Sequence, residues 1–190
     1  MRQQNPVRLP LAVALPRLAA CAGRTAGLLA QGRVHLPRTW VGTSLWFADG
    51  SSSWVYRETV LDCPPSADPC GLVVEFRLRL VRGRGHALFR AGSLLNTVLF
   101  VGFPGFVSKL WMAADEHGVY RGIYEWDAPE RAHAYVRALW WALAVVSDTK
   151  SIRYRVLPGL RRDELLGGSH RVDALLPAEP GQWWRPLELR

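Results

Sequence analysis

Four strand-like segments are interleaved with two helical segments, and this order limits the folds open to the chain. Val74–Leu80 alternates strictly between apolar and polar residues, as a half-buried strand does. Phe106–Met112 and Val119–Trp126 are β-rich and flank the turn signal Asp115–Gly118, which predicts a hairpin. Ile152–Leu157 alternates again and is the fourth predicted strand. An antiparallel sheet built from such segments buries one apolar face.

The two helical segments lie between the first and second strands and between the third and fourth. The first helix is predicted from His86 to about Val101 and is weakened by Gly92. The second follows Asp127, which can cap it, and Glu130 completes a capping box. The order β-α-β-β-α-β predicts an α+β, ferredoxin-like fold with an antiparallel four-stranded sheet. Both helices cover one face of that sheet, and the other face needs a cover.

Segments outside this pattern give the chain four expected regions. The N-terminal segment holds an Ala/Leu-rich helix, and the next is rich in Trp and Tyr around a turn signal. An isolated hairpin is marginal in water, so we expect this one to dock on the main domain. The last region is expected to wrap over the domain or over a partner subunit. The regions are a basic arm at 1–37 with a helix from about Pro16 to Ala30, an aromatic β-hairpin and Pro-rich linker at 38–70, the ferredoxin-like domain at 71–159, and a C-terminal tail at 160–190.

The net charge of +8 is concentrated in the N-terminal arm. Residues 1–40 hold six Arg and no acid, whereas the rest is nearly balanced. The sequence Leu18–Cys21 fits the bacterial lipoprotein cleavage pattern, but the apolar run before it is short and Arg17 interrupts it. We therefore predict a cytoplasmic protein whose arm packs on the domain. The alternatives are a lipoprotein, or peripheral contact with an anionic membrane surface through residues 1–30.

No metal site or cofactor is predicted. The three Cys and five His show no metal-ligand spacing, and the chain has no G-x-G-x-x-G, P-loop or H-E-x-x-H motif. Cys63 and Cys70 flank a Pro-rich turn and could pair, but an odd cysteine count in a reducing compartment favours free thiols.

Nucleic-acid binding is the rival reading of this topology, because RNA-recognition motifs share the strand order. Arg121–Trp126 resembles their basic-Gly-aromatic strand at first sight. The aromatic platform needs rings at the third and fifth positions, where this chain has Ile123 and Glu125. Tyr124 and Trp126 therefore point to the opposite side of the sheet, and no nucleic-acid partner is predicted.

Two adjacent motifs suggest a family. Phe103–Trp111 contains Pro-Gly and Ser-Lys-x-Trp, and Tyr120–Asp127 contains Gly-Ile-Tyr-x-Trp. This strand pair resembles the YdhR-like mono-oxygenases of the dimeric α/β-barrel superfamily, over roughly residues 71–159. The resemblance implies a homodimer whose two sheets form one barrel. It also implies kinship with antibiotic-biosynthesis mono-oxygenases, which oxidise aromatic polyketide-type substrates without metal or flavin.

Members of that superfamily also catalyse decarboxylation, isomerisation and cyclisation, or handle haem. A fold alone is weak ground for a reaction type. A cofactor-independent mono-oxygenase acting on an aromatic or polyketide-like substrate is the leading hypothesis. A non-catalytic small-molecule-binding dimer and a cyclase or isomerase remain open.

Three residues are candidate catalytic groups, each with a plainer interpretation. His86 could be a general base or a simple first-turn histidine. Asn96 stands in an apolar stretch and could bond a substrate oxygen or the backbone. Lys109 could orient a substrate, act as a desolvated base, or form an ion pair on the barrel face with Glu125 or another acid.

The substrate site has two possible places. One lies between the sheet and the helices, and the other is the barrel face, toward which Glu75, Arg77 and Arg79 would point if Val74, Phe76, Leu78 and Leu80 face the helices. Aromatic side chains could stack on a planar substrate or simply pack in the core. The candidates for substrate binding are Trp111, Tyr124, Trp126 and Trp140.

Overall fold

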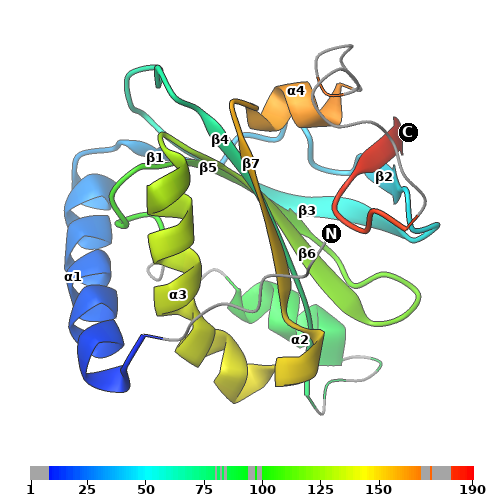
Figure 1. Ribbon diagram of the computed structural model, residues 1–190, viewed down its shortest axis with the longest axis horizontal. Coiled ribbons are helices and arrows are strands. Elements are labelled where there is room, and N and C mark those ends of the chain that lie inside the picture. The colour runs from blue at the N-terminus through cyan, green and yellow to red at the C-terminus, as the bar shows by residue number, and fades with distance from the viewer. Residues whose placement is uncertain are drawn as a thin grey trace.

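The strands form one curled antiparallel sheet in the computed structural model, which describes residues 9–79, 81, 83, 85–93, 97, 100–167, 172 and 181–190 (Figure 1). The strand order is β7-β4-β6-β5-β3-β2-β8, with β1 paired to β3. The strands are β1 Val34–His35, β2 Ser44–Phe47, β3 Ser52–Leu61, β4 Cys70–Arg77, β5 Phe106–Met112, β6 Val119–Trp126, β7 Arg153–Pro158 and β8 Pro186–Leu189. The helices are α1 Leu11–Ala30, α2 Gly85–Gly92, α3 Pro129–Val146 and α4 Arg162–Leu166, with a short 3-10 turn at Thr149–Ser151.

The central part of the sheet has the ferredoxin-like topology that the sequence predicts. In chain order the four strands of the domain are β4, β5, β6 and β7, and they lie in the sheet as β7-β4-β6-β5. α2 connects β4 to β5, and α3 connects β6 to β7. The predicted bounds of β5 and β6 are confirmed.

The aromatic hairpin extends the sheet instead of packing across it. β2 and β3 pair around the turn at 48–51, and β3 pairs antiparallel with β5 through the register Thr59↔Lys109. β8 then pairs with the outer edge of β2. The hairpin thus docks by backbone hydrogen bonding, which satisfies a strand edge that would otherwise be exposed.

Several predicted boundaries are wrong. β4 begins at Cys70, inside the expected linker, and ends at Arg77, and six of its eight residues are buried because both sheet faces are covered. α2 ends at Gly92 and not near Val101, since glycine is a poor helix former. Asp127 does not cap α3, because its carboxylate accepts from Arg131 at 2.8 Å. α1 begins at Leu11, before the expected start at Pro16.

One sheet face packs against helices α1 and α3, which lie side by side (Figure 1). α1 contributes Cys21 and Leu28 to this core, and α3 contributes Tyr135 and Leu139. Gly102 allows the close approach of α1, because a Cβ there would lie 2.1 Å from the Cys21 carbonyl oxygen. The N-terminal helix is therefore an integral part of the helix-side core.

The opposite sheet face carries a second core, covered by the chain's own C-terminal segment. Leu160, Leu165, Leu166 and Trp184 pack there against sheet residues that include Leu110 and Ile123. Ion pairs fix α4 on the sheet: Arg162 contacts Glu58 at 3.0 Å. The resemblance assigns this sheet face to a partner subunit, but the chain's own C-terminal segment covers it. The expected homodimer stays a prediction, and it would need another surface or a displaced tail.

Candidate active site

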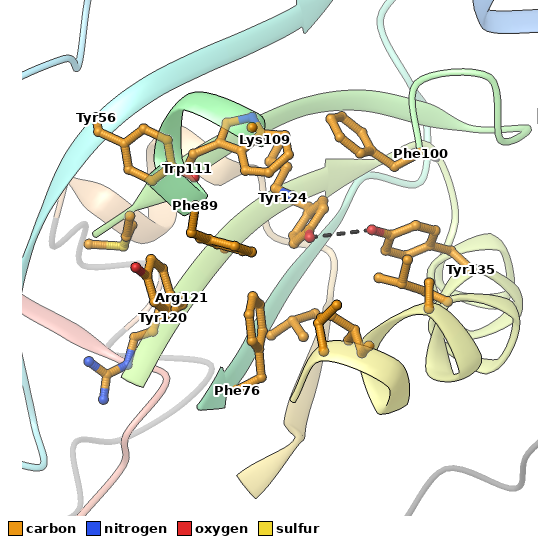
Figure 2. Close-up of a pocket in the computed structure, with 18 residues that line it drawn as sticks. Tyr56, Phe76, Phe89, Phe100, Lys109, Trp111, Tyr120, Arg121, Tyr124 and Tyr135 are labelled. Atoms are coloured by element: carbon orange, nitrogen blue, oxygen red, sulfur yellow. Dashed lines mark hydrogen bonds between the residues drawn. The ribbon is translucent and has the colours of Figure 1, made fainter. Parts of the chain in front are cut away.

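A cavity of about 410 Å³ lies between the sheet and the helices within one chain (Figure 2). Its walls are almost wholly apolar and aromatic, and they come from β3, β4, β5, β6, α2 and α3, with Phe100 from a turn before β5. This volume falls within the range of about 300–1,000 Å³ that is usual for small-molecule sites. The lining residues are Tyr56, Val74, Phe76, Phe89, Gly92, Phe100, Lys109, Trp111, Met112, Tyr120, Arg121, Gly122, Tyr124, Tyr135, Leu139, Ala142, Leu143 and Val146.

Strand alternation brings Lys109 into the cavity. Leu110 belongs to the second core, so Lys109 and Trp111 on either side of it face the helices. The Lys109 nitrogen lies 3.2 Å from the Trp111 ring centroid, 4.5 Å from that of Phe100 and 4.6 Å from that of Tyr124. Lys109 is 6% exposed, and its side chain forms no ion pair or hydrogen bond with any residue that the structure describes.

The structure contradicts the ion pair between Lys109 and Glu125 that the sequence left open. Glu125 points to the other sheet face, where its carboxylate accepts from Arg161 at 3.2 Å and from the Arg162 backbone N–H at 3.2 Å. Neighbouring strand residues alternate between faces, so Lys109 and Glu125 cannot meet across the sheet. Among the described side chains, those that contact the Lys109 nitrogen are all aromatic.

Burial lowers the pKa of Lys109 well below its usual value, and the positive charge of Arg57 lowers it further. The Arg57 guanidinium carbon lies 3.9 Å from the same Trp111 ring centroid. The three ring faces favour the ammonium form and oppose part of this shift. Desolvation is the largest cause of the shift, because moving an ammonium away from water costs several kcal/mol. The amine is therefore far easier to deprotonate than an exposed lysine.

A buried tyrosine pair forms the wall beside Lys109. The Tyr135 hydroxyl donates to the Tyr124 hydroxyl at 3.3 Å (Figure 2). Burial raises the pKa of both tyrosines, so both stay protonated. Gly122 makes room for this arrangement, because a Cβ there would lie 2.8 Å from the Tyr124 ring.

His86 touches the site through another residue. Its Nδ1 lies 2.7 Å from the Tyr120 hydroxyl, and the two rings stack at 5.7 Å between centroids. Tyr120 lines the cavity and its pKa is raised by burial to about 12, whereas His86 is not a lining residue. Phe76 and Phe89 pack on Tyr120, with centroids 5.9 Å and 4.8 Å away. This aromatic group joins α2 to the sheet at one end of the cavity.

The structure brings together only some of the residues singled out from the sequence. Lys109, Trp111 and Tyr124 line the cavity. Trp126 is fully buried against Phe106 and Tyr135, and Trp140 is also buried, but neither is a lining residue. Asn96 lies outside the described residues. Of the two places considered for the site, the described cavity is the one between sheet and helices.

Sequence reasoning missed Tyr56, Phe89, Tyr120 and Tyr135 as lining residues. Tyr135 carried a signal, since it stands on the apolar face of the second predicted helix. Tyr56 carried none, because nothing in the hairpin sequence shows that β3 adds to the edge of β5.

Glu75 faces the second core, as the alternation predicts. It forms an ion pair with Arg153 and contacts Arg121 at 3.4 Å, and Arg121 also contacts Asp115 at 3.0 Å. The Arg121 side chain accordingly points away from the cavity (Figure 2). Arg79 lies beyond the end of β4, where it donates to the Ser147 carbonyl at 3.4 Å.

No disulfide joins Cys21, Cys63 and Cys70, and burial raises the pKa of Cys70 to about 11. Within the described ranges, no cluster of three or more His, Cys, Asp or Glu side chains is arranged to hold a metal ion. Among the described helices, none combines the length and hydropathy needed to cross a bilayer.

Comparison with known proteins gives similarities at low identity. No family model and no curated protein matches the chain. Among solved structures, it is similar to an uncharacterized ferredoxin-fold protein related to antibiotic biosynthesis monooxygenases from Listeria monocytogenes 4b F2365, with 13% identity, a TM-score of 0.43, and coverage of 59% of this chain and 66% of that one. It is also similar to a major regulator of staphylococcal pathogenesis, with 17% identity, a TM-score of 0.40, and coverage of 58% of this chain and 69% of that one. A third similar structure is an anthrone oxidase-like protein, with 13% identity, a TM-score of 0.35, and coverage of 74% of this chain and 56% of that one.

Proposed function

We propose that the protein is a small-molecule enzyme that binds a planar aromatic or polyketide-like substrate in the cavity and oxidises it with O₂ without a cofactor. The observation that carries the proposal is the desolvated Lys109 amine inside an aromatic-walled cavity. The strand-pair motifs that resemble the YdhR-like mono-oxygenases agree with it.

Lys109 is the proposed general base. A neutral amine can remove a proton from an activated C–H group of the substrate, and a lowered pKa places the base nearer to working pH. The ammonium so formed is stabilised by the Phe100, Trp111 and Tyr124 ring faces and by the substrate anion. The same rings offer stacking surfaces to a planar substrate.

The substrate anion then transfers an electron to O₂, and the two radicals combine to a peroxide. Loss of water from the peroxide leaves a carbonyl, so that R₂CH₂ and O₂ give R₂C=O and H₂O. Exclusion of water by the apolar walls protects the anion from reprotonation. His86 is a proposed positioning residue, because it acts on the cavity wall through Tyr120.

Oxygen uptake with a panel of hydroxyquinones and anthrones tests this function. We expect uptake with at least one of them, and loss of at least about 100-fold in Lys109→Met, the lower range for a general base. Lys150→Met is the matched control, since Lys150 is exposed and is not a lining residue. Uptake that Lys109→Met leaves unchanged would remove Lys109 as the base. Saturable quenching of Trp fluorescence without any uptake would instead contradict the oxygenase and favour a non-catalytic binding protein.

A further inference from the structure

The chain has two lysines, and they lie in opposite environments. Lys150 is exposed in the 3-10 turn after α3, whereas Lys109 is 6% exposed and lines the cavity. Among the described residues, no carboxylate contacts the Lys109 nitrogen. Arg57, permanently charged, lies against the same Trp111 ring and disfavours a second cation there.

A neutral amine is a nucleophile as well as a base. In a cavity of about 410 Å³, a bound molecule can approach Lys109, because Lys109 lines the cavity among mostly apolar and aromatic side chains. Desolvated lysines in apolar pockets are activated for attack on carbonyl groups. Such a site favours condensation, because the apolar walls exclude the water that would reverse it.

We propose that Lys109 captures an aromatic aldehyde or ketone covalently, as an imine, inside the cavity. The nitrogen adds to the carbonyl carbon, and the resulting carbinolamine expels water. That water carries away the carbonyl oxygen and both amine hydrogens, so a C=N bond replaces the C=O bond without an oxidant or reductant. The proposal rests on the proposed function for the cavity and its aromatic ligands. It assigns Lys109 a different role, that of a nucleophile and not of a general base.

The walls select the aromatic part of the ligand. Trp111, Phe100 and Tyr124 surround the nitrogen with ring faces, and Phe76, Phe89 and Tyr120 line the cavity further along (Figure 2). Aromatic pairs prefer stacked or edge-to-face contact, which such walls can offer to a planar molecule. A carbonyl attached directly to an aromatic ring is therefore the expected partner of the amine.

Reductive trapping with hydroxynaphthaldehyde and sodium cyanoborohydride tests this inference on the intact protein. Tryptic mapping by mass spectrometry then compares Lys109, Lys150 and the N-terminal amine, so the wild-type chain contains its own control. We expect Lys109 to be labelled at least about tenfold faster than Lys150 near neutral pH, because each unit by which a pKa falls gives tenfold more free amine. Preincubation with naphthol, which has the ring but no carbonyl, should slow labelling of Lys109 and leave Lys150 unaffected.

Equal labelling of the two lysines, or no labelling of Lys109 until the protein is denatured, would overturn the inference. Lys109→Arg should abolish the adduct and Lys150→Arg should retain it; the naphthol arm serves if Lys109→Arg fails to fold. The two proposals fail separately. Trapping at Lys109 without oxygen uptake contradicts the oxygenase alone, whereas Lys109-dependent uptake without trapping contradicts the imine alone.

Discussion

The Lys109 nitrogen lies 3.2 Å from the centroid of the Trp111 ring, two residues further along β5. The strand thus supplies both the amine and the surface that receives it, without any turn or loop between them. Because both side chains project from a central strand of the sheet, their separation is set by backbone geometry. Such placement suits a reactive group, since sites built on strands are held more accurately than sites on loops.

Replacing Lys109 by Met should stabilise the protein at neutral pH. The folded pKa of Lys109 is lowered, so between that pKa and about 10.4 the unfolded chain binds one more proton, and stability rises with pH in this window. Lys109→Met removes this penalty, worth about 1–3 kcal/mol for a buried polar group without a partner. Urea denaturation should show a gain at neutral pH that shrinks as the pH rises towards about 10.4. A gain that is constant with pH would contradict the assigned titration.

The tyrosine pair should behave as a coupled unit. Tyr135→Phe removes the hydrogen bond donated to Tyr124, and we expect a loss of about 0.5–1.5 kcal/mol in the free energy of unfolding. The double variant Tyr124→Phe/Tyr135→Phe should lose less than the sum of the two single changes, because no hydroxyl is then left unpaired. A double-mutant cycle by chemical denaturation measures this coupling, and strict additivity would argue against the bond.

Gly122→Ala should damage the cavity wall. The new methyl group would lie 2.8 Å from the Tyr124 ring, so the ring must move, at a cost of about 1–3 kcal/mol for overpacking. Gly23→Ala on α1 is the matched control, since no atom lies within 4 Å of its Cβ position. We expect that control to stabilise the helix by about 0.5–1 kcal/mol. Thermal unfolding compares the two, and equal effects would contradict the close contact at Gly122.

Breaking the ion pair that holds α4 on the sheet should lower the free energy of unfolding strongly. Arg162 and Glu58 lie 3.0 Å apart with side chains 7% and 2% exposed, so Arg162→Met leaves a buried carboxylate without its ion-pair partner. The expected loss is about 3–5 kcal/mol, and a second change of Glu58→Met should recover much of it. Arg161→Met is the control: Arg161 is 40% exposed in its pair with Glu125, and about 0–1 kcal/mol is expected. Similar losses at both positions in urea denaturation would show that burial does not set the strength of the pair.

The four-strand core of the fold could be predicted from sequence because its signals are local. The β-rich run of β6 and the turn before it predict the strand, and alternation within a strand puts Tyr124 on the side opposite to Ile123. The addition of β3 to β5 and the return of β8 to β2 depend on contacts between distant segments. No periodicity encodes them, and Tyr56 was missed as a cavity residue for that reason.

The sequence identifies Lys109 as a candidate residue, but it does not predict that the amine is buried and has a lowered pKa. Its environment depends on Phe100, Trp111 and Tyr124 meeting from different segments, and on Glu125 being engaged by Arg161. Trp126 and Trp140 were also candidates, but they lie in the core and not in the cavity. An aromatic residue on the correct face can lie in the core or in the cavity, and strand alternation alone does not separate the two.

The pairing of β2 with β8 has a consequence for synthesis of the protein. β2 is translated before β8, yet its outer edge pairs with Pro186–Leu189, which are translated after all the other described strands. Until then the nascent chain carries an open strand edge next to the tryptophans of the hairpin. A ribosome-associated chaperone, or another chain emerging nearby, would meet that edge before the protein's own last strand does.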